Sequence, residues 1–197
     1  MATKTKSSAT LSKADIFEAD ELIALARLDI EHGHLDEALW KLKQAHTDAA
    51  APPEVFAMLA RLYAQLGLWE RAKPLFERYL AAEPHAVNES FQLGMVHFDS
   101  GQANEAIKIW DKLLLTQPTH PPALFYRALA KQQLGQTAEA RHALDVLLKS
   151  APPDNLYFTR GKELLQALDT QPTAARGAAS APAAMQMAPK DAYKTEH

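Results

Sequence analysis

The feature that most constrains this chain is a constant spacing of 34 residues between four glycines: Gly33, Gly67, Gly101 and Gly135. An alanine stands five residues after each of these glycines: Ala38, Ala72, Ala106 and Ala140. The three later units also share a proline in register: Pro84, Pro118 and Pro152. Self-similarity at a fixed period of this size is typical of repeat architectures. The sequence therefore predicts one structural unit built four times.

Each unit reads as two helices joined by a tight turn. Glycine has no Cβ, so it can take the left-handed conformation that ends a helix. Acidic residues follow each glycine, where the positive end of the next helix dipole favours them: Asp36, Glu37, Glu70, Glu105 and Glu139. The recurrent alanine lets the two helices approach closely. The second helix stops near the proline, because the residue before a proline is pushed out of helical geometry.

This pattern resembles the tetratricopeptide repeat family over residues 19–154, divided as 19–52, 53–86, 87–120 and 121–154. The second unit matches the family signature at Leu59-Ala60, Tyr63, Gly67, Ala72, Phe76 and Pro84. The other units depart from it, and the aromatic position of the first helix reads Asp29, Tyr63, His97 and Lys131. The resemblance implies an all-α fold, a right-handed α-solenoid of four helix hairpins.

The segments on either side of the repeats differ in composition. Residues 155–169 predict a further helix whose apolar stripe caps the last hairpin, because a repeat array otherwise exposes its final stacking surface. We expect the array with this capping helix to occupy residues 15–171. Residues 1–14 and the Ala/Pro-rich residues 172–197 contain few large apolar side chains. Their composition predicts a disordered leader and a disordered tail.

Charge and cysteine content exclude several classes of function. The chain has no cysteine, which excludes disulfides, thiolate metal sites and a cysteine nucleophile. The whole chain has a net charge of −3. Residues 1–14 contribute +3 and residues 172–197 contribute +1, so the array between them has a net charge of −7. An acidic body argues against nucleic acid as the main partner. No apolar run is long enough to span a membrane and the start is not a secretory signal, so we expect a cytoplasmic protein.

Motifs for catalysis are absent from the sequence. It contains no Walker loop, no dinucleotide glycine fingerprint, no HExxH and no GxSxG. His32 and His34 flank Gly33, but no set of acids and histidines accompanies them at ligand spacing. We interpret them as residues of a solvated turn, and His97 as a half-buried histidine. The sequence predicts a protein that is not an enzyme and binds neither a metal nor a cofactor.

The family resemblance places the first helix of each hairpin on the concave face of the superhelix. The predicted peptide-binding residues of this groove are Ile23, Arg27, Arg61, Phe91, Met95, Phe98, Phe125, Tyr126 and Leu129. Family members that hold an acidic chaperone C-terminus use cations and amides where this chain has Ile23, Ala57 and Phe91, so we expect no carboxylate clamp. The groove suits an apolar segment, helical or extended, with an acidic end towards Arg27 and Arg61. Core packing of some of these aromatics is the alternative.

Two classes of function fit these features. The first is an adaptor that binds a partner protein, and bacterial secretion chaperones resemble this plan, although they usually carry three repeats. The second is a structural protein that assembles into homo-oligomers through its apolar columns or an exposed repeat end. The sequence favours the adaptor and does not name its partner.

Overall fold

The computed structural model describes residues 17–47 and 51–170, and within these ranges the chain forms nine α-helices and no strand. Four hairpins pair α1 (Ala19–Glu31) with α2 (Leu35–His46), α3 (Pro53–Gln65) with α4 (Trp69–Ala82), α5 (Val87–Asp99) with α6 (Ala103–Thr116), and α7 (Pro121–Gln133) with α8 (Thr137–Ser150). The helix α9 (Leu156–Thr170) follows them. The all-α repeat fold is therefore confirmed. The predicted leader and tail, residues 1–14 and 172–197, lie outside the described residues.

The four periodic glycines form the turns inside the hairpins. Gly33, Gly67, Gly101 and Gly135 have φ angles of 78°, 71°, 80° and 73°, all in the left-handed region. At Gly33 an added Cβ would meet no atom within 4 Å. The backbone conformation, rather than a lack of space, therefore requires glycine there. The second helix of each hairpin begins two residues later, with an acidic residue in its first turn.

The recurrent alanines lie where the two helices of a hairpin cross. Ala38, Ala72, Ala106 and Ala140 are completely buried. One turn further along each second helix stands a large apolar residue that is also completely buried: Leu42, Phe76, Trp110 and Leu144. Three second helices end two residues before a proline, as predicted. Small residues at the crossing and large residues beside it thus repeat the same packing in every unit.

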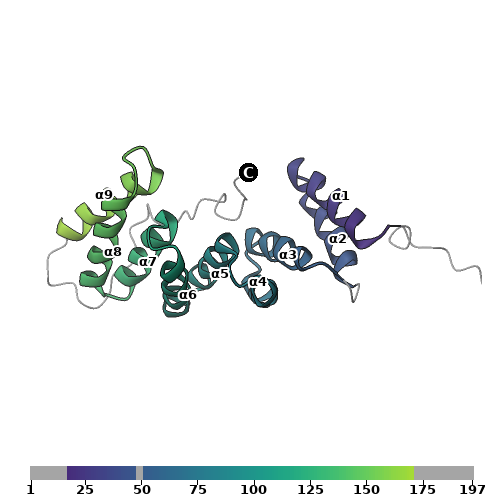
Figure 1. The fold of residues 1–197 in the computed structure, drawn as a ribbon, viewed down its shortest axis with the longest axis horizontal. Helices are drawn as coiled ribbons and strands as arrows, with labels where there is room; N and C mark the ends of the chain where they lie inside the picture. Colours follow the sequence, from purple (N-terminus) through teal and green to yellow (C-terminus); the bar gives the residue numbers. More distant parts are fainter. Residues whose placement is uncertain (1–16, 48–50, 171–197) are drawn as a thin grey trace, which may run out of the picture.

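The hairpins follow one another along the long axis of the molecule, with α1 and α2 at one end and α9 at the other (Figure 1). The first helix of each later hairpin packs against the second helix of the hairpin before it. The helices α3, α5 and α7 are therefore each covered by a second helix of the preceding hairpin, whereas among the described residues α1 has no such helix.

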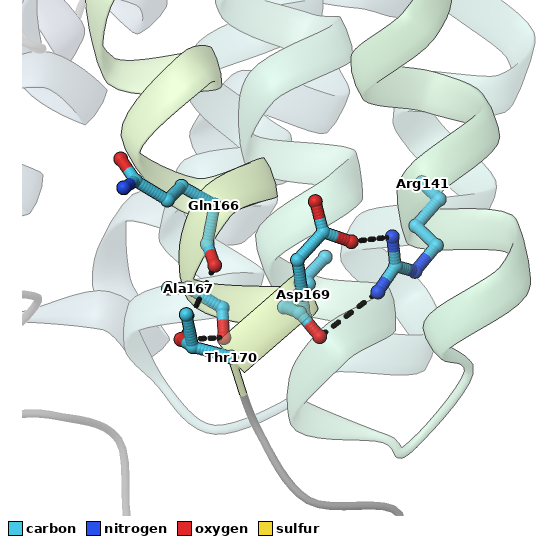
Figure 2. A network of polar contacts seen from close by, with 6 residues as sticks. Arg141, Gln166, Ala167, Asp169 and Thr170 are labelled. Carbon is cyan, nitrogen blue, oxygen red and sulfur yellow. Dashed lines mark hydrogen bonds and ion pairs between the residues drawn. The ribbon is translucent and has the colours of Figure 1, made fainter.

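The last helix packs against α8 and α7 through Leu164 and Leu168, which are buried. Arg141 on α8 binds the carboxylate of Asp169 and donates to the Leu168 carbonyl oxygen at 2.9 Å (Figure 2). The hydroxyl of Thr170 donates to the carbonyl oxygens of Gln166 and Ala167 in the final turn. The predicted helix at 155–169 is thus present, and its role as a stability cap stays a prediction.

Candidate functional site

The predicted groove residues all lie on the first helices of the hairpins, and we call this set the inner wall: Ile23 and Arg27 on α1, Arg61 on α3, Phe91, Met95 and Phe98 on α5, and Phe125, Tyr126 and Leu129 on α7. Six of these side chains are buried, with 0–8% of their surface exposed: Ile23, Phe91, Met95, Phe125, Tyr126 and Leu129. Phe98 and Arg61 are half-buried, and Arg27 is exposed. The apolar residues of the wall therefore pack mainly within the array.

Tyr126 is the centre of an aromatic cluster made of Phe91, Phe98, Trp110, Phe125, Tyr126 and Tyr157. Its ring centroid lies 5.3 Å from that of Phe125, 5.8 Å from Phe91 and 6.3 Å from Phe98. Rings at these separations attract one another when tilted or edge-on. The structure thus brings together the four aromatic residues that the sequence analysis placed in the groove.

Trp110 on α6 is a member of this cluster that the groove prediction did not include. Its indole Nε1 donates to the Phe91 carbonyl oxygen at 3.2 Å. An added Cβ at Gly94 would lie 2.2 Å from that same nitrogen, so only glycine leaves room for the ring. The signal was present in the sequence, because small residues recur in this register at Ala26, Ala60, Gly94 and Ala128.

The Tyr126 hydroxyl lies in a dry environment. Burial raises the pKa of Tyr126 far above its ordinary value, nearby Tyr157 raises it further, and Arg160 opposes the shift. The phenol therefore stays protonated at neutral pH. Its chemistry is that of a hydrogen-bonding group within a packed cluster, and it is unsuited to act as a base or a nucleophile.

Both arginines of the inner wall are paired with acids from the following hairpin. Arg27 binds Glu54, and both side chains are about half exposed. Arg61 donates to Glu89 at 2.9 Å, where the two side chains are 19% and 12% exposed. The hydrogen bond and charge of Glu54 raise the pKa of Arg27. A partner with an acidic end therefore has to compete with Glu54 and Glu89 for these guanidinium groups.

Three histidines, His32, His97 and His120, form local hydrogen bonds. His120 accepts the Ala123 N–H at 3.2 Å through Nδ1, and burial lowers the pKa of His120. The His32 ring lies 6.1 Å from that of His34 and donates to the Leu28 carbonyl oxygen at 2.7 Å. His97 contacts the Gln102 side-chain oxygen at 2.7 Å. Within residues 17–47 and 51–170, no three His, Cys, Asp or Glu side chains gather as metal ligands do.

Comparison with protein families agrees with this geometry. A tetratricopeptide repeat model matches residues 29–89, and a model described as anaphase-promoting complex, cyclosome, subunit 3 matches residues 65–147. The chain is thus similar to the tetratricopeptide repeat family in sequence over residues 29–89 and in its repeated helix hairpins. The two matches overlap, and together they span residues from all four predicted units.

Solved structures share the fold. The protein MamA (AMB-1) is 24% identical to this chain with a TM-score of 0.66, over 71% of this chain and 82% of MamA. YrrB is 19% identical with a TM-score of 0.67, over 74% of both chains, and is described as a TPR protein with an unusual peptide-binding site. Similarity at these identities establishes the shared solenoid fold.

A curated relative is the probable biofilm formation methyltransferase WspC of Pseudomonas putida, 34% identical over 88 residues. The matched region is 45% of this chain but 20% of that relative. The similarity thus spans one fifth of the relative's length, and it does not establish catalysis here. In the part of the chain that the structure describes, every helix is too short or too polar to cross a membrane.

Proposed function

We propose that this repeat protein is a non-enzymatic adaptor that binds an apolar segment of a partner protein along the inner wall. The observation that carries the proposal is the repeated hairpin itself, which sets α1, α3, α5 and α7 in the same place in four successive units. Side-by-side helices present a groove in which an extended chain or a helix can lie. The described peptide-binding site of the similarly folded YrrB supports this use of the fold.

In this proposal the inner-wall residues have two roles. Arg27, Arg61 and Phe98 have exposed atoms and contact the partner directly. The six buried residues, Ile23, Phe91, Met95, Phe125, Tyr126 and Leu129, hold these groups in position and contribute the edges of their rings and methyl groups. An acidic residue of the partner exchanges with Glu54 at the exposed Arg27 more readily than with Glu89 at the more buried Arg61, since desolvated pairs are harder to replace.

The finer version of this proposal is a cytoplasmic chaperone-like adaptor of the bacterial secretion type, which shields an apolar segment of a client. It is supported by the acidic array and by the mixture of apolar and arginine side chains on one wall. Such a protein exists as a monomer with its groove available. Light scattering on the pure protein distinguishes this state from a self-assembling one.

Photo-crosslinking from the inner wall tests the proposal. A photoreactive amino acid at Arg27 or at Gln132, which shares the repeat position of Phe98, samples the wall near each end. The same group at Lys108 or His142, exposed residues of second helices, is the matched control. We expect one partner protein to be crosslinked from the wall positions and not from the controls, with the crosslinked peptide rich in apolar residues.

A synthetic copy of the crosslinked peptide completes the experiment. Its affinity should fall when Phe98 is changed to alanine, because truncating an aromatic contact typically costs about 2 kcal/mol or more. Circular dichroism confirms that the Phe98→Ala protein is still folded. Equal crosslinking from Lys108 and Arg27, or unchanged affinity in a folded Phe98→Ala protein, would rule out the inner wall as the binding surface.

A further inference from the structure

The two ends of the array differ in what covers them. At one end α9 packs against α7 and α8, whereas at the other end no described helix covers one face of α1. Three residues on one side of α1 are exposed: Glu21, Ala24 and Leu28, the last at 51%. The residues at the same repeat positions in the later units are all buried. They are Val55, Met58 and Leu62 on α3; Glu89, Gln92 and Val96 on α5; and Ala123, Tyr126 and Ala130 on α7. The later positions are buried because the second helix of the preceding hairpin packs there.

A groove of about 570 Å³ adjoins this face. Four apolar side chains line it, Phe17, Leu22, Leu25 and Trp40, together with Asp36, Glu37 and Lys41. Phe17 and Trp40 are each 41% exposed, and Leu25 is half-buried beside Leu28 on α1. In the other units the position of Trp40 is held by Pro74, Lys108 and His142. The exposed Leu28 next to a groove lined by Phe17 and Trp40 forms apolar surface of the kind that marks an interaction site.

The charge around the groove is negative. Residues 17–47 contain seven acids and three Lys or Arg residues, a net charge of −4. The Lys41 amino group, the cation that lines the groove, binds Asp29 and lies 3.7 Å from Glu37. Asp36 and Glu37 are both exposed in the first turn of α2. The apolar floor therefore has an acidic border.

We infer that this end of the array, formed by Phe17, α1 and α2, is a second docking surface and that its ligand is a basic amphipathic helix of a partner protein. A helix is the ligand because α2, α4 and α6 cover the equivalent faces of α3, α5 and α7. Lysines or arginines on its polar side complement the acidic border, and its apolar side covers Leu28, Trp40 and Phe17. The surface adjoins the inner wall at Ala24, which shares the repeat position of Tyr126, but its centre differs, since Leu28 lies one residue and thus about 100° round α1 from Arg27.

Fluorescence of Trp40 provides a direct test. In a Trp69→Phe background two tryptophans remain, exposed Trp40 and fully buried Trp110, so acrylamide quenching reports on Trp40. The probes are two synthetic helical peptides of about 14 residues with the same leucine stripe, one with lysines and one with glutamates on the polar side. We expect the lysine peptide to bind, to shield Trp40 from acrylamide and to bind less tightly as salt increases. The glutamate peptide should neither bind nor shield Trp40 from acrylamide.

Matched variants distinguish binding at this surface from nonspecific hydrophobic binding. Leu28→Asp should weaken the lysine peptide about tenfold or more, whereas Leu66→Asp, at an equally exposed leucine, should change its affinity less than about twofold. Glu37→Lys should weaken binding strongly, whereas Glu139→Lys, at the same repeat position in the last unit, should not. All four side chains are exposed, so the variants are expected to fold.

Four results would overturn the inference. Equal binding of the two peptides, or an affinity that Leu28→Asp leaves unchanged, removes the basic helix as the ligand. A dimer of the full chain that Leu28→Asp converts to a monomer means that a second copy covers the face. Shielding of Trp40 in the free protein that is lost when residues 1–16 are deleted means that this N-terminal segment covers the face.

Discussion

The first and second halves of the array connect their units through different chemistry at the same repeat position. This position reads Arg27, Arg61, Met95 and Leu129. In the first two units its arginines form ion pairs with the next hairpin, whereas Met95 and Leu129 are buried with the aromatic cluster beside them. The period therefore fixes where neighbouring units meet, and the residue at that position decides whether the contact is ionic or apolar.

This difference has a consequence for stability. Solenoid stability is approximately a sum of unit and nearest-neighbour contributions. Exposed ion pairs contribute at most about 1 kcal/mol, whereas burial of one large apolar side chain contributes about 1.5–3 kcal/mol. We expect the half with the aromatic cluster to unfold last. Four substitutions test this comparison, in order of decreasing effect.

Trp110→Ala should have the largest effect, because it removes a fully buried ring that contacts Phe91, Phe98 and Tyr126 of the aromatic cluster. Large-to-small changes of this kind cost about 3–5 kcal/mol of unfolding free energy. Urea denaturation followed by circular dichroism measures the loss. Trp40→Ala, at a 41% exposed tryptophan, is the control and should change stability by about 0.5 kcal/mol or less. Similar losses in the two variants would contradict a main contribution of the aromatic cluster to stability.

Gly94→Ala should come next, since its Cβ would lie 2.2 Å from the Trp110 indole nitrogen. Overpacking of a core costs about 1–3 kcal/mol, more than the alanine gains in helix propensity. At Gly161 the Cβ would lie 2.9 Å from the Leu147 Cδ2, a terminal methyl group that can move, so Gly161→Ala should cost less. Thermal melts of the two variants measure the difference, and a more stable Gly94→Ala protein would disprove the close approach.

Arg61→Met, which copies the residue of the third unit, should destabilise the protein by about 1–3 kcal/mol. The reason is that the Glu89 carboxylate, only 12% exposed, loses its partner. Adding Glu89→Gln should recover much of the loss. Arg27→Met breaks an exposed pair and should cost less than about 1 kcal/mol. Chemical denaturation of the three proteins gives these values, and equal costs for Arg61→Met and Arg27→Met would show that burial does not distinguish the pairs.

The smallest effect on stability is expected from the substitution His120→Asn. In the wild type the neutral Nδ1 of His120 accepts the Ala123 N–H at the start of α7. Burial lowers the pKa of His120 in the folded protein below its ordinary value of 6.5. Below that pH the unfolded chain binds the proton more readily than the folded protein, so stability decreases as the pH falls. His120→Asn keeps a capping oxygen without this titration. The melting temperatures at about pH 8 and about pH 5 should differ less for the His120→Asn protein than for the wild type.

The sequence predicted the fold in detail because the fold depends on local geometry. Left-handed glycines at Gly33 and Gly135, acids in the first turns and prolines after the second helices all act within a few residues of the backbone they control. Each therefore leaves a mark at a fixed position in every repeat. The extra helix near residues 155–169 was likewise visible as an apolar stripe, and its observed bounds differ by one residue at each end.

The candidate site was only partly visible in the sequence, since exposure depends on how units pack. The sequence placed Phe91, Met95 and Phe125 in the groove, and the structure buries them against neighbouring helices. It also assigned Arg27 and Arg61 to a partner's acidic end, whereas Glu54 and Glu89 already pair with them. Whether these residues bind a partner stays a prediction.

The sequence by itself determined the number of repeats, the turn positions and which residues share a face, because these follow from the helical period and backbone conformation. Only the tertiary structure decided which faces remain uncovered. Leu28 and Leu62 occupy the same repeat position, yet one is 51% exposed and the other 3% exposed. The reason is that a neighbouring unit determines how exposed each side chain is. The position of a residue within its repeat does not say whether a neighbouring unit packs against it.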